Sequence, residues 1–187
     1  DQSARGNPLS LKPDMASLAT GSVNFPTIVY ENAPALVVEL ATRMKANEVV
    51  PEIEIFDLSH IYGAQRLVES GLLTDHPHVQ FVMGIKNAMP VEEHLLDILL
   101  SELKRVLPKA TWTAAGIGRY QTEVIDWVLK RNGDAVRTGL EDNIRISQDR
   151  LAKSNAELVE IAVERCARHE ARAATPAEAR LMLGLPA

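Results

Sequence analysis

The chain has 187 residues, of which 46% are hydrophobic, so it is long enough to bury a substantial core as one domain. Its formal net charge of −5, without a long basic run, argues against nucleic acid or an anionic membrane as the main partner. No apolar stretch reaches the roughly 18 residues of a membrane span. The single cysteine, Cys166, excludes an internal disulfide framework and favours a reducing compartment, which predicts a cytoplasmic protein.

Short apolar segments alternate with amphipathic helical patterns along the chain. The apolar segments predict five strands, at residues 15–18, 52–56, 79–83, 111–115 and 135–140. Helical spacing predicts a helix after each of the first four: one capped at Asn32, one over about 61–69, one from Pro90 and one ending near Gly133. Two further helices with capping boxes follow, one at Ser154 and Glu157, the other at Thr175 and Glu178.

This alternation indicates parallel βαβ units and an α/β fold. A Rossmann fold is disfavoured because no Gly-x-Gly-x-x-Gly motif follows the first strand. Polar residues recur after every predicted strand, which favours a (β/α)8 TIM barrel, whose site is built from the loops at that end. A barrel needs eight units and typically about 250 residues. We therefore predict that residues 1–187 form a single domain that carries the last five βα units and the C-terminal helices, with the first three strands absent from this chain.

The segment Arg137–Asn143 holds the densest group of reactive side chains. It places a guanidinium, a hydroxyl, two adjacent carboxylates and an amide at the end of a predicted strand. Carboxylates crowded there cost desolvation and mutual repulsion unless a cation or a proton offsets them. A metal ion, with Arg137 as partner of the second carboxylate, would do so. On spacing alone, a solvated pair formed by Glu141 and Asp142 explains the pattern equally well.

Other polar positions carry weaker signals. Glu54 lies between two isoleucines in a strand expected to be covered on both faces, so its carboxylate needs a partner. Ser17, taken alone, is a small strand residue, and His60 either caps a helix or lines the pocket. His76 and His78 have the spacing of a metal-binding pair. They precede the third strand, at the end of the barrel opposite the site, so a surface turn is the better interpretation.

Several spaced motifs together resemble the β-keto acid cleavage enzymes, typified by 3-keto-5-aminohexanoate cleavage enzyme. They are Met15–Phe25, Glu52–Asp57, Thr113–Arg119 and Arg137–Asn143, and the C-terminal segments 154–158 and 175–179 also fit. The resemblance covers nearly all of this chain but only the last two-thirds of a family member. It implies a (β/α)8 acyltransferase that depends on a divalent metal, usually zinc. Such an enzyme converts a β-keto acid and acetyl-CoA into acetoacetate and a new acyl-CoA, and it is a homo-oligomer, a tetramer in the family.

Carried over by motif, the resemblance also implies a role for five residues. Glu141 would be a metal ligand, and Asp142 the carboxylate that activates the keto acid. Arg137 would be the charge partner of Asp142, Ser17 would hydrogen-bond the keto acid, and Glu54 would be a supporting acidic group. The family's other two metal ligands are histidines of a His-x-His pair, which we expect to lie N-terminal to this chain.

Two alternatives remain open at this point. The chain could belong to another metal-assisted carbon–carbon lyase of the aldolase type on the same barrel, or it could be an inactive, N-terminally truncated remnant. Which β-keto acid is used does not follow from the sequence. We also expect that residues 1–187 alone do not form a stable, active monomer, because five strands of eight leave unpaired sheet edges at 15–18 and 135–140.

Overall fold

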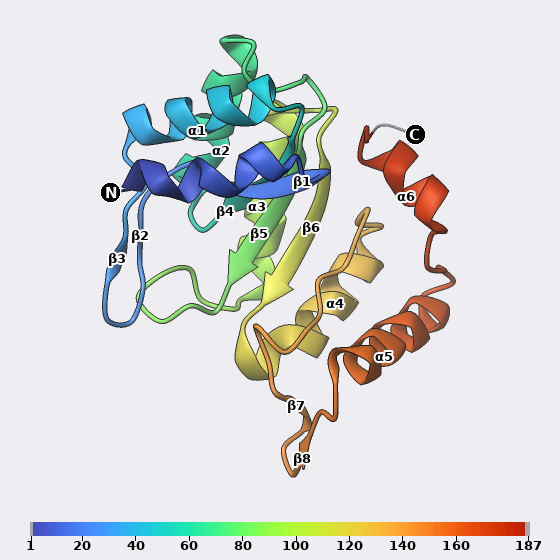
Figure 1. Ribbon diagram of the computed structural model, residues 1–187. Helices are drawn as coiled ribbons and strands as arrows, with labels where there is room; N and C mark the ends of the chain where they lie inside the picture. The colour runs from blue at the N-terminus through green and yellow to red at the C-terminus, as the bar shows by residue number, and fades with distance from the viewer. Residues whose placement is uncertain (1, 186–187) are drawn as a thin grey trace.

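The computed structural model describes residues 2–185. At its centre is a parallel four-stranded sheet in the order β1-β4-β5-β6 (Figure 1). These strands are Met15–Ala19, Val50–Ile55, His78–Met83 and Thr111–Gly116. Their positions confirm the first four predicted strands to within two residues at each end. Successive parallel strands are neighbours in the sheet, without the reversal of strand order that marks a doubly wound fold.

Four helices alternate with these strands: α1 (Pro34–Ala46), α2 (Leu58–Glu69), α3 (Glu93–Val106) and α4 (Gln121–Lys130). Helix α2 starts three residues earlier than predicted, because Asp57 caps it by accepting a hydrogen bond from the Ser59 amide at 2.9 Å. The predicted cap of α1 is wrong. Ala33 occupies that position, while Asn32 is buried and its side-chain oxygen accepts a hydrogen bond from Arg5 at 2.9 Å.

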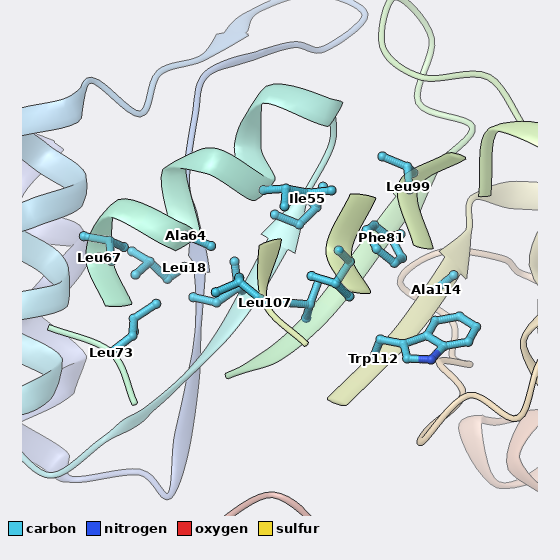
Figure 2. Packing of buried hydrophobic residues seen from close by; sticks show 14 of the residues in the cluster. Leu18, Ile55, Ala64, Leu67, Leu73, Phe81, Leu99, Leu107, Trp112 and Ala114 are labelled. Atoms are coloured by element: carbon cyan, nitrogen blue, oxygen red, sulfur yellow. The ribbon is translucent and has the colours of Figure 1, made fainter. Parts of the chain in front are cut away.

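One face of the sheet is apolar and packs against these four helices. Side chains alternate between the two faces along a strand, so with the observed register Ile53, Ile55, Phe81 and Trp112 point to the same side, and none is more than 6% exposed. Figure 2 shows Ile55, Phe81 and Trp112 in this core. They meet the apolar stripes of the helices in one continuous core. Burying each such side chain contributes about 1.5–3 kcal/mol, so this face accounts for much of the stability of the fold.

The opposite face of the sheet is polar. In the strand register, Ser17, Glu52, His78 and Thr111 form one row across the four strands. Ala19, Glu54, Gln80 and Thr113 form the next row toward the carboxyl ends of the strands. A parallel sheet is ordinarily covered and apolar on both faces. These two rows consist mostly of ionisable and hydrogen-bonding side chains, which sets this face apart from the apolar face.

The fifth predicted strand is wrong. Residues 135–140 form no strand, although Asp134 starts beside β6 with a hydrogen bond from its amide to the Trp112 carbonyl at 3.0 Å. Further on, side chains take the backbone groups that a sheet ladder would use. Gln121 donates to the Gly139 carbonyl at 3.0 Å, and Asn155 accepts from the Leu140 amide at 2.8 Å. The φ of +150° at Gly139 also departs from strand geometry.

Helices α5 (Asn155–Arg168) and α6 (Pro176–Met182) form the C-terminal part. The capping box of α6 is confirmed in full, whereas that of α5 is confirmed by half. Ser154 accepts from the Glu157 amide, but the Glu157 carboxylate binds the Lys153 amide instead of that of Ser154. Smaller elements that the sequence did not predict are η1 (Gln2–Leu11), η2 (Gly118–Tyr120), the hairpin β2–β3 (Val23–Asn24, Val29–Tyr30) and the hairpin β7–β8 (Arg145–Ser147, Arg150–Leu151). None of the helices within residues 2–185 has the length and apolar character to cross a bilayer.

Candidate functional site

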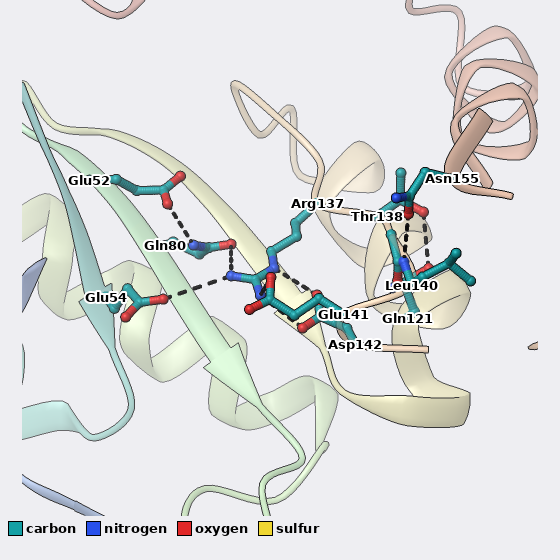
Figure 3. Close-up of polar contacts among 11 residues, drawn as sticks. Glu52, Glu54, Gln80, Gln121, Arg137, Thr138, Leu140, Glu141, Asp142 and Asn155 are labelled. Atoms are coloured by element: carbon teal, nitrogen blue, oxygen red, sulfur yellow. Dashed lines mark hydrogen bonds and ion pairs between the residues drawn. The ribbon is translucent and has the colours of Figure 1, made fainter. Parts of the chain in front are cut away.

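The guanidinium of Arg137 is the centre of the polar face (Figure 3). It binds the Asp142 carboxylate through two bonds, from Nε to Oδ2 at 2.6 Å and from Nη2 to Oδ1 at 2.8 Å. Nη2 also reaches Oε2 of Glu141 at 3.2 Å, and Nη1 lies 3.7 Å from Oε1 of Glu54. The Asp142 side chain is only 6% exposed, whereas that of Glu141 is 84% exposed. A bidentate pair of this kind fixes orientation as well as charge.

The loop that carries Arg137 is held by hydrogen bonds on both sides. The buried side chain of Gln121, at the start of α4, accepts from Thr138 at 2.9 Å and donates to the Gly139 carbonyl at 3.0 Å. The Gly118 amide donates to the Asp142 carbonyl at 2.7 Å, so the turn after β6 is tied to the carboxylate pair. Glycine is required at position 139, because its φ of +150° lies where side chains are strained.

Two glutamates of β4 lie on the other side of the guanidinium. Glu52 and Glu54 point to the same face because they are two residues apart on one strand. Burial raises the pKa of both carboxyl groups, and the positive charge of Arg137 offsets part of that effect. For Glu54, the neighbouring carboxylates raise the pKa further. Burial also lowers the pKa of Arg137, but the bond to Asp142 and the nearby negative charges raise it overall.

The site holds more carboxyl groups than cationic groups. Arg137 faces Asp142, Glu141 and Glu54 directly, and Glu52 lies behind Gln80. A raised pKa for Glu54 means that this group holds a proton more readily than an exposed glutamate does. The arrangement therefore combines an oriented carboxylate, a fixed cation and a carboxyl group suited to proton exchange. Such a set can move a proton to or from a bound small molecule.

Four of the five predicted site residues are brought together by direct contacts: Arg137, Asp142, Glu141 and Glu54. Ser17, the fifth, lines the same cavity of about 310 Å³ as Glu52, Glu54, Arg137 and Glu141. Spacing along the sequence did not by itself predict that Glu54 lies beside Arg137, because these two residues are far apart along the chain. The roles assigned to these residues remain predictions.

In the part of the chain that the structure describes, the predicted metal ligand Glu141 does not belong to a group of side chains that could hold a metal ion. Within residues 2–185, no three histidine, cysteine, aspartate or glutamate side chains are grouped closely enough to hold a metal ion. The Glu141 carboxylate pairs with Arg137. The described residues therefore do not make up a metal site by themselves, and Glu141 can supply one ligand.

The three histidines discussed above have different environments. His76 is exposed, as expected for a surface turn, but the interpretation is wrong for His78. His78 opens β5, is buried, and its Nδ1 lies 2.9 Å from Oγ1 of Thr111. The cause is that Pro77 begins the strand pairing through its carbonyl, which accepts from the Thr111 amide. His60 is also buried, and its Nδ1 accepts from the Phe56 amide at 3.2 Å, so it holds the turn between β4 and α2.

Sequence reasoning missed Gln80 and the contact role of Glu52. Gln80 is 1% exposed, and its side chain lies between Arg137 and Glu52. One signal was available: a lone amide in the otherwise apolar run from Val79 to Met83. A buried amide needs hydrogen-bond partners, so its presence there indicated a polar neighbour on the adjoining strand.

Comparisons with known proteins show what this chain is similar to. A family described as beta-keto acid cleavage enzyme matches residues 1–185. The chain is 53% identical over 97% of its length to the 3-oxoadipate:acetyl-CoA acetyltransferase of Cupriavidus necator. It is 35% identical, over the same share, to the 3-keto-5-aminohexanoate cleavage enzyme of Acetoanaerobium sticklandii. It spans 64% and 65% of the lengths of these two relatives.

Solved structures show the fold. The apo structure of ObcA matches with a TM-score of 0.81 and 20% identity, covering 92% of this chain and 44% of that one. A ternary complex of ObcA with a C4-CoA adduct and oxalate gives a TM-score of 0.82 over 92% of this chain and 46% of that one. The parallel sheet is therefore part of a TIM barrel, as the alternation of strands and helices predicted. The polar face lies on the inner side of that sheet, opposite the helices.

Proposed function

The chain belongs to the beta-keto acid cleavage enzyme family, and on that premise we propose that the protein containing it is an acetyl-CoA-dependent acyltransferase. Its reaction would convert a β-keto acid and acetyl-CoA into acetoacetate and a new acyl-CoA. The observation that carries the proposal is the bidentate pair of Arg137 and Asp142 beside the cavity that Ser17 and Glu54 line. Relatives named for acetyl-CoA-dependent reactions on β-keto acids support it.

In this proposal Asp142 is the general base. It takes a proton from C2, the carbon between the keto group and the carboxylate, where a proton is acidic because the resulting charge spreads onto the keto oxygen. Arg137 holds the Asp142 carboxylate in one orientation through its two hydrogen bonds. Ser17 donates a hydrogen bond to the keto acid, and Glu54 is the supporting acidic group, consistent with its raised pKa.

The bonds then change in a balanced sequence. The C2 carbanion attacks the acetyl carbonyl carbon of acetyl-CoA, and coenzyme A leaves as its thiolate. The thiolate attacks the original keto carbon, C3, and the bond between C2 and C3 breaks. The new acyl-CoA keeps C3, while C2 becomes part of the acetoacetate enolate. The proton held by Asp142 returns to that enolate, so the enzyme ends in its starting state.

Three further features belong to the proposal. A divalent metal, zinc, would be bound with Glu141 as the one ligand that this chain supplies, and no step above depends on it. The protein would be a cytoplasmic homo-oligomer, in line with the family resemblance and the single cysteine. Residues 1–187 would belong to one barrel domain.

The experiment uses the full-length protein with 3-oxoadipate and acetyl-CoA, because the relative that is 53% identical is named for that pair. We expect acetoacetate and succinyl-CoA in equal amounts, measured by mass spectrometry. Omitting acetyl-CoA is the control: an aldolase-type lyase would still cleave the keto acid, whereas this enzyme would not. If 3-oxoadipate is not cleaved, a panel of other β-keto acids shows whether the enzyme uses a different substrate or lacks the activity. Cleavage without acetyl-CoA, or no acyl-CoA from any of the panel, would contradict the proposal.

A further inference from the structure

We propose that Gln80 and Glu52 are positioning residues that hold the guanidinium of Arg137 in the orientation in which it binds Asp142. The inference rests on the proposed function, because that function gives Arg137 and Asp142 their roles. Neither Gln80 nor Glu52 touches Asp142, so both would act through Arg137.

The geometry is a bridge of two hydrogen bonds (Figure 3). The Gln80 side-chain carbonyl accepts from Nη1 of Arg137 at 3.3 Å, and its amide nitrogen donates to Oε2 of Glu52 at 3.1 Å. Gln80 lies on β5 and Glu52 on β4, two paired strands of the rigid sheet. The bridge therefore connects a loop side chain to the strands.

Only one orientation of the Gln80 amide satisfies both partners. A guanidinium has donors and no acceptor, so the Gln80 oxygen must face Arg137; the Gln80 NH₂ then faces Glu52, whose carboxyl group has an acceptor oxygen in either protonation state. Turning the amide over would place its NH₂ against the N–H groups of Arg137 and its oxygen against Glu52. The bridge thus fixes the amide, and the fixed amide leaves one position for Nη1. With Nη1 held, Nε and Nη2 face Asp142.

A neutral side chain suits this place better than a charged one. Arg137 already contacts Asp142, Glu141 and Glu54. Another carboxylate in direct contact would compete with Asp142 for the same N–H groups. The Gln80 carbonyl holds Nη1 without adding negative charge, and its burial at 1% exposure keeps water from replacing the bond.

On its far side Glu52 faces His78. Its Oε1 lies 3.9 Å from Nε2 of His78, and Nδ1 of His78 lies 2.9 Å from Oγ1 of Thr111. Glu52 pairs with His78, and His78 with Thr111, in the register of three neighbouring strands. Glu52 keeps an acceptor oxygen for Gln80 whether or not it is protonated. What matters for the bridge is therefore the acceptor and not the charge, and this distinction can be tested.

The kinetic test compares five variants of the full-length protein in the acyl-transfer assay. Gln80→Met and Glu52→Met keep the approximate volume but break the bridge. We expect each to lower kcat by on the order of tenfold or more, as is typical of groups that orient an active-site residue, with a smaller change in KM. Glu52→Gln keeps an acceptor oxygen and should therefore lower kcat much less than Glu52→Met does. The double variant Gln80→Met/Glu52→Met should be no slower than Gln80→Met, because both changes break one bridge.

The matched control is Thr113→Val. Thr113 pairs with Gln80 in the register, and among residues 2–185 its buried hydroxyl has no hydrogen-bond partner. Removing that hydroxyl should leave kcat unchanged. An unchanged kcat in Gln80→Met would overturn the proposal. So would equal losses in Glu52→Gln and Glu52→Met, which would show that Glu52 acts through its charge, or additive losses in the double variant.

A second measurement needs no activity. The Nε–H of Arg137 should give a slowly exchanging nuclear magnetic resonance signal, which Arg137→Lys removes and so assigns. We expect Gln80→Met and Glu52→Met to shift this signal and speed its exchange, while Glu52→Gln and Thr113→Val leave it in place. If the wild type shows the signal but no acyl transfer, the proposed function fails and the bridge stands. If the signal is unchanged in a folded Gln80→Met variant, Gln80 does not hold Arg137 and the proposal is wrong.

Discussion

Arg137 and Asp142 are joined by two hydrogen bonds, 2.6 Å and 2.8 Å long, although only four residues separate them in the sequence. The chain must turn back between them for this contact to form. Gly139, at a φ of +150°, provides that turn, and Gln121 holds it by accepting from Thr138 and donating to the Gly139 carbonyl. The local backbone therefore places the pair before any substrate arrives.

Asp142→Asn tests the role of the base. Asparagine keeps the shape of the side chain but cannot take up a proton, and its NH₂ group would face the guanidinium donors. We expect kcat in the full-length protein to fall by on the order of 10² or more, and exchange of the C2 proton with deuterium from solvent to stop. Asp149→Asn, an exposed aspartate in the β7–β8 hairpin, is the control. Exchange at the normal rate in Asp142→Asn would show that another group is the base.

Glu141→Gln tests the metal assignment. The Glu141 side chain is 84% exposed, so the substitution should leave the fold intact, as measured by circular dichroism. An amide is neutral and binds a divalent ion weakly. We expect the full-length variant to lose both zinc, measured by elemental mass spectrometry, and nearly all turnover. Glu160→Gln, an exposed glutamate on α5, should lose neither. Normal zinc content in Glu141→Gln would remove Glu141 from the ligand set.

The fold was predictable where local pattern determines the structure. The mostly apolar run Val79–Met83 predicted a strand, and capping residues such as Thr175 and Glu178 set a helix start locally. The segment at 135–140 has the composition of a strand. Its backbone partners, however, are side chains of Gln121 and Asn155, contacts that depend on tertiary packing and leave no periodic signal.

The candidate site was predictable by the same criterion. Glu141, Asp142 and Arg137 lie within one short segment, so their proximity follows from the sequence. The bridge through Gln80 does not, because it depends on the register that pairs Glu52 with His78 and Glu54 with Gln80. A shift of one residue would turn Gln80 to the apolar face. His78 was misinterpreted for the same reason, since its burial follows from pairing with Thr111.

Helix α6 provides a test of pH dependence away from the site. The pKa of Glu178 is lowered from 4.5 to about 2. The hydrogen bond from Arg172 has the largest effect, and the hydrogen bonds with the amide and the hydroxyl of Thr175 add to it. Between these pH values the unfolded chain binds more protons than the folded one, so the cap loses its stabilising effect as pH falls from 4.5 to about 2. In Arg172→Ala, a nuclear magnetic resonance titration of the Glu178 carboxyl carbon should give a midpoint closer to 4.5. An unchanged midpoint would show that Arg172 has no part in the shift.

The last prediction concerns a chain limited to residues 1–187. Within residues 2–185, β1 and β6 each pair with one neighbouring strand, so both are edge strands of the sheet, although Asp134 bonds to Trp112 on the outer side of β6. The second edge strand is therefore β6 and not the segment 135–140 that the sequence predicted. Open edges favour pairing with another chain, and the polar face with Glu52, Glu54 and Arg137 lacks the closure that a complete barrel gives.

We therefore expect this chain by itself to associate through its edges, and to show no acyl transfer. Sedimentation velocity measures the first outcome, and acetoacetate release measures the second. Adding the N-terminal third of the relatives as a separate polypeptide should convert the oligomers to a defined complex and restore activity, because it would supply the missing neighbours of both edges. A monodisperse monomer with full activity would refute this prediction. It would also require the metal ligands to be sought among His60, His76 and His78.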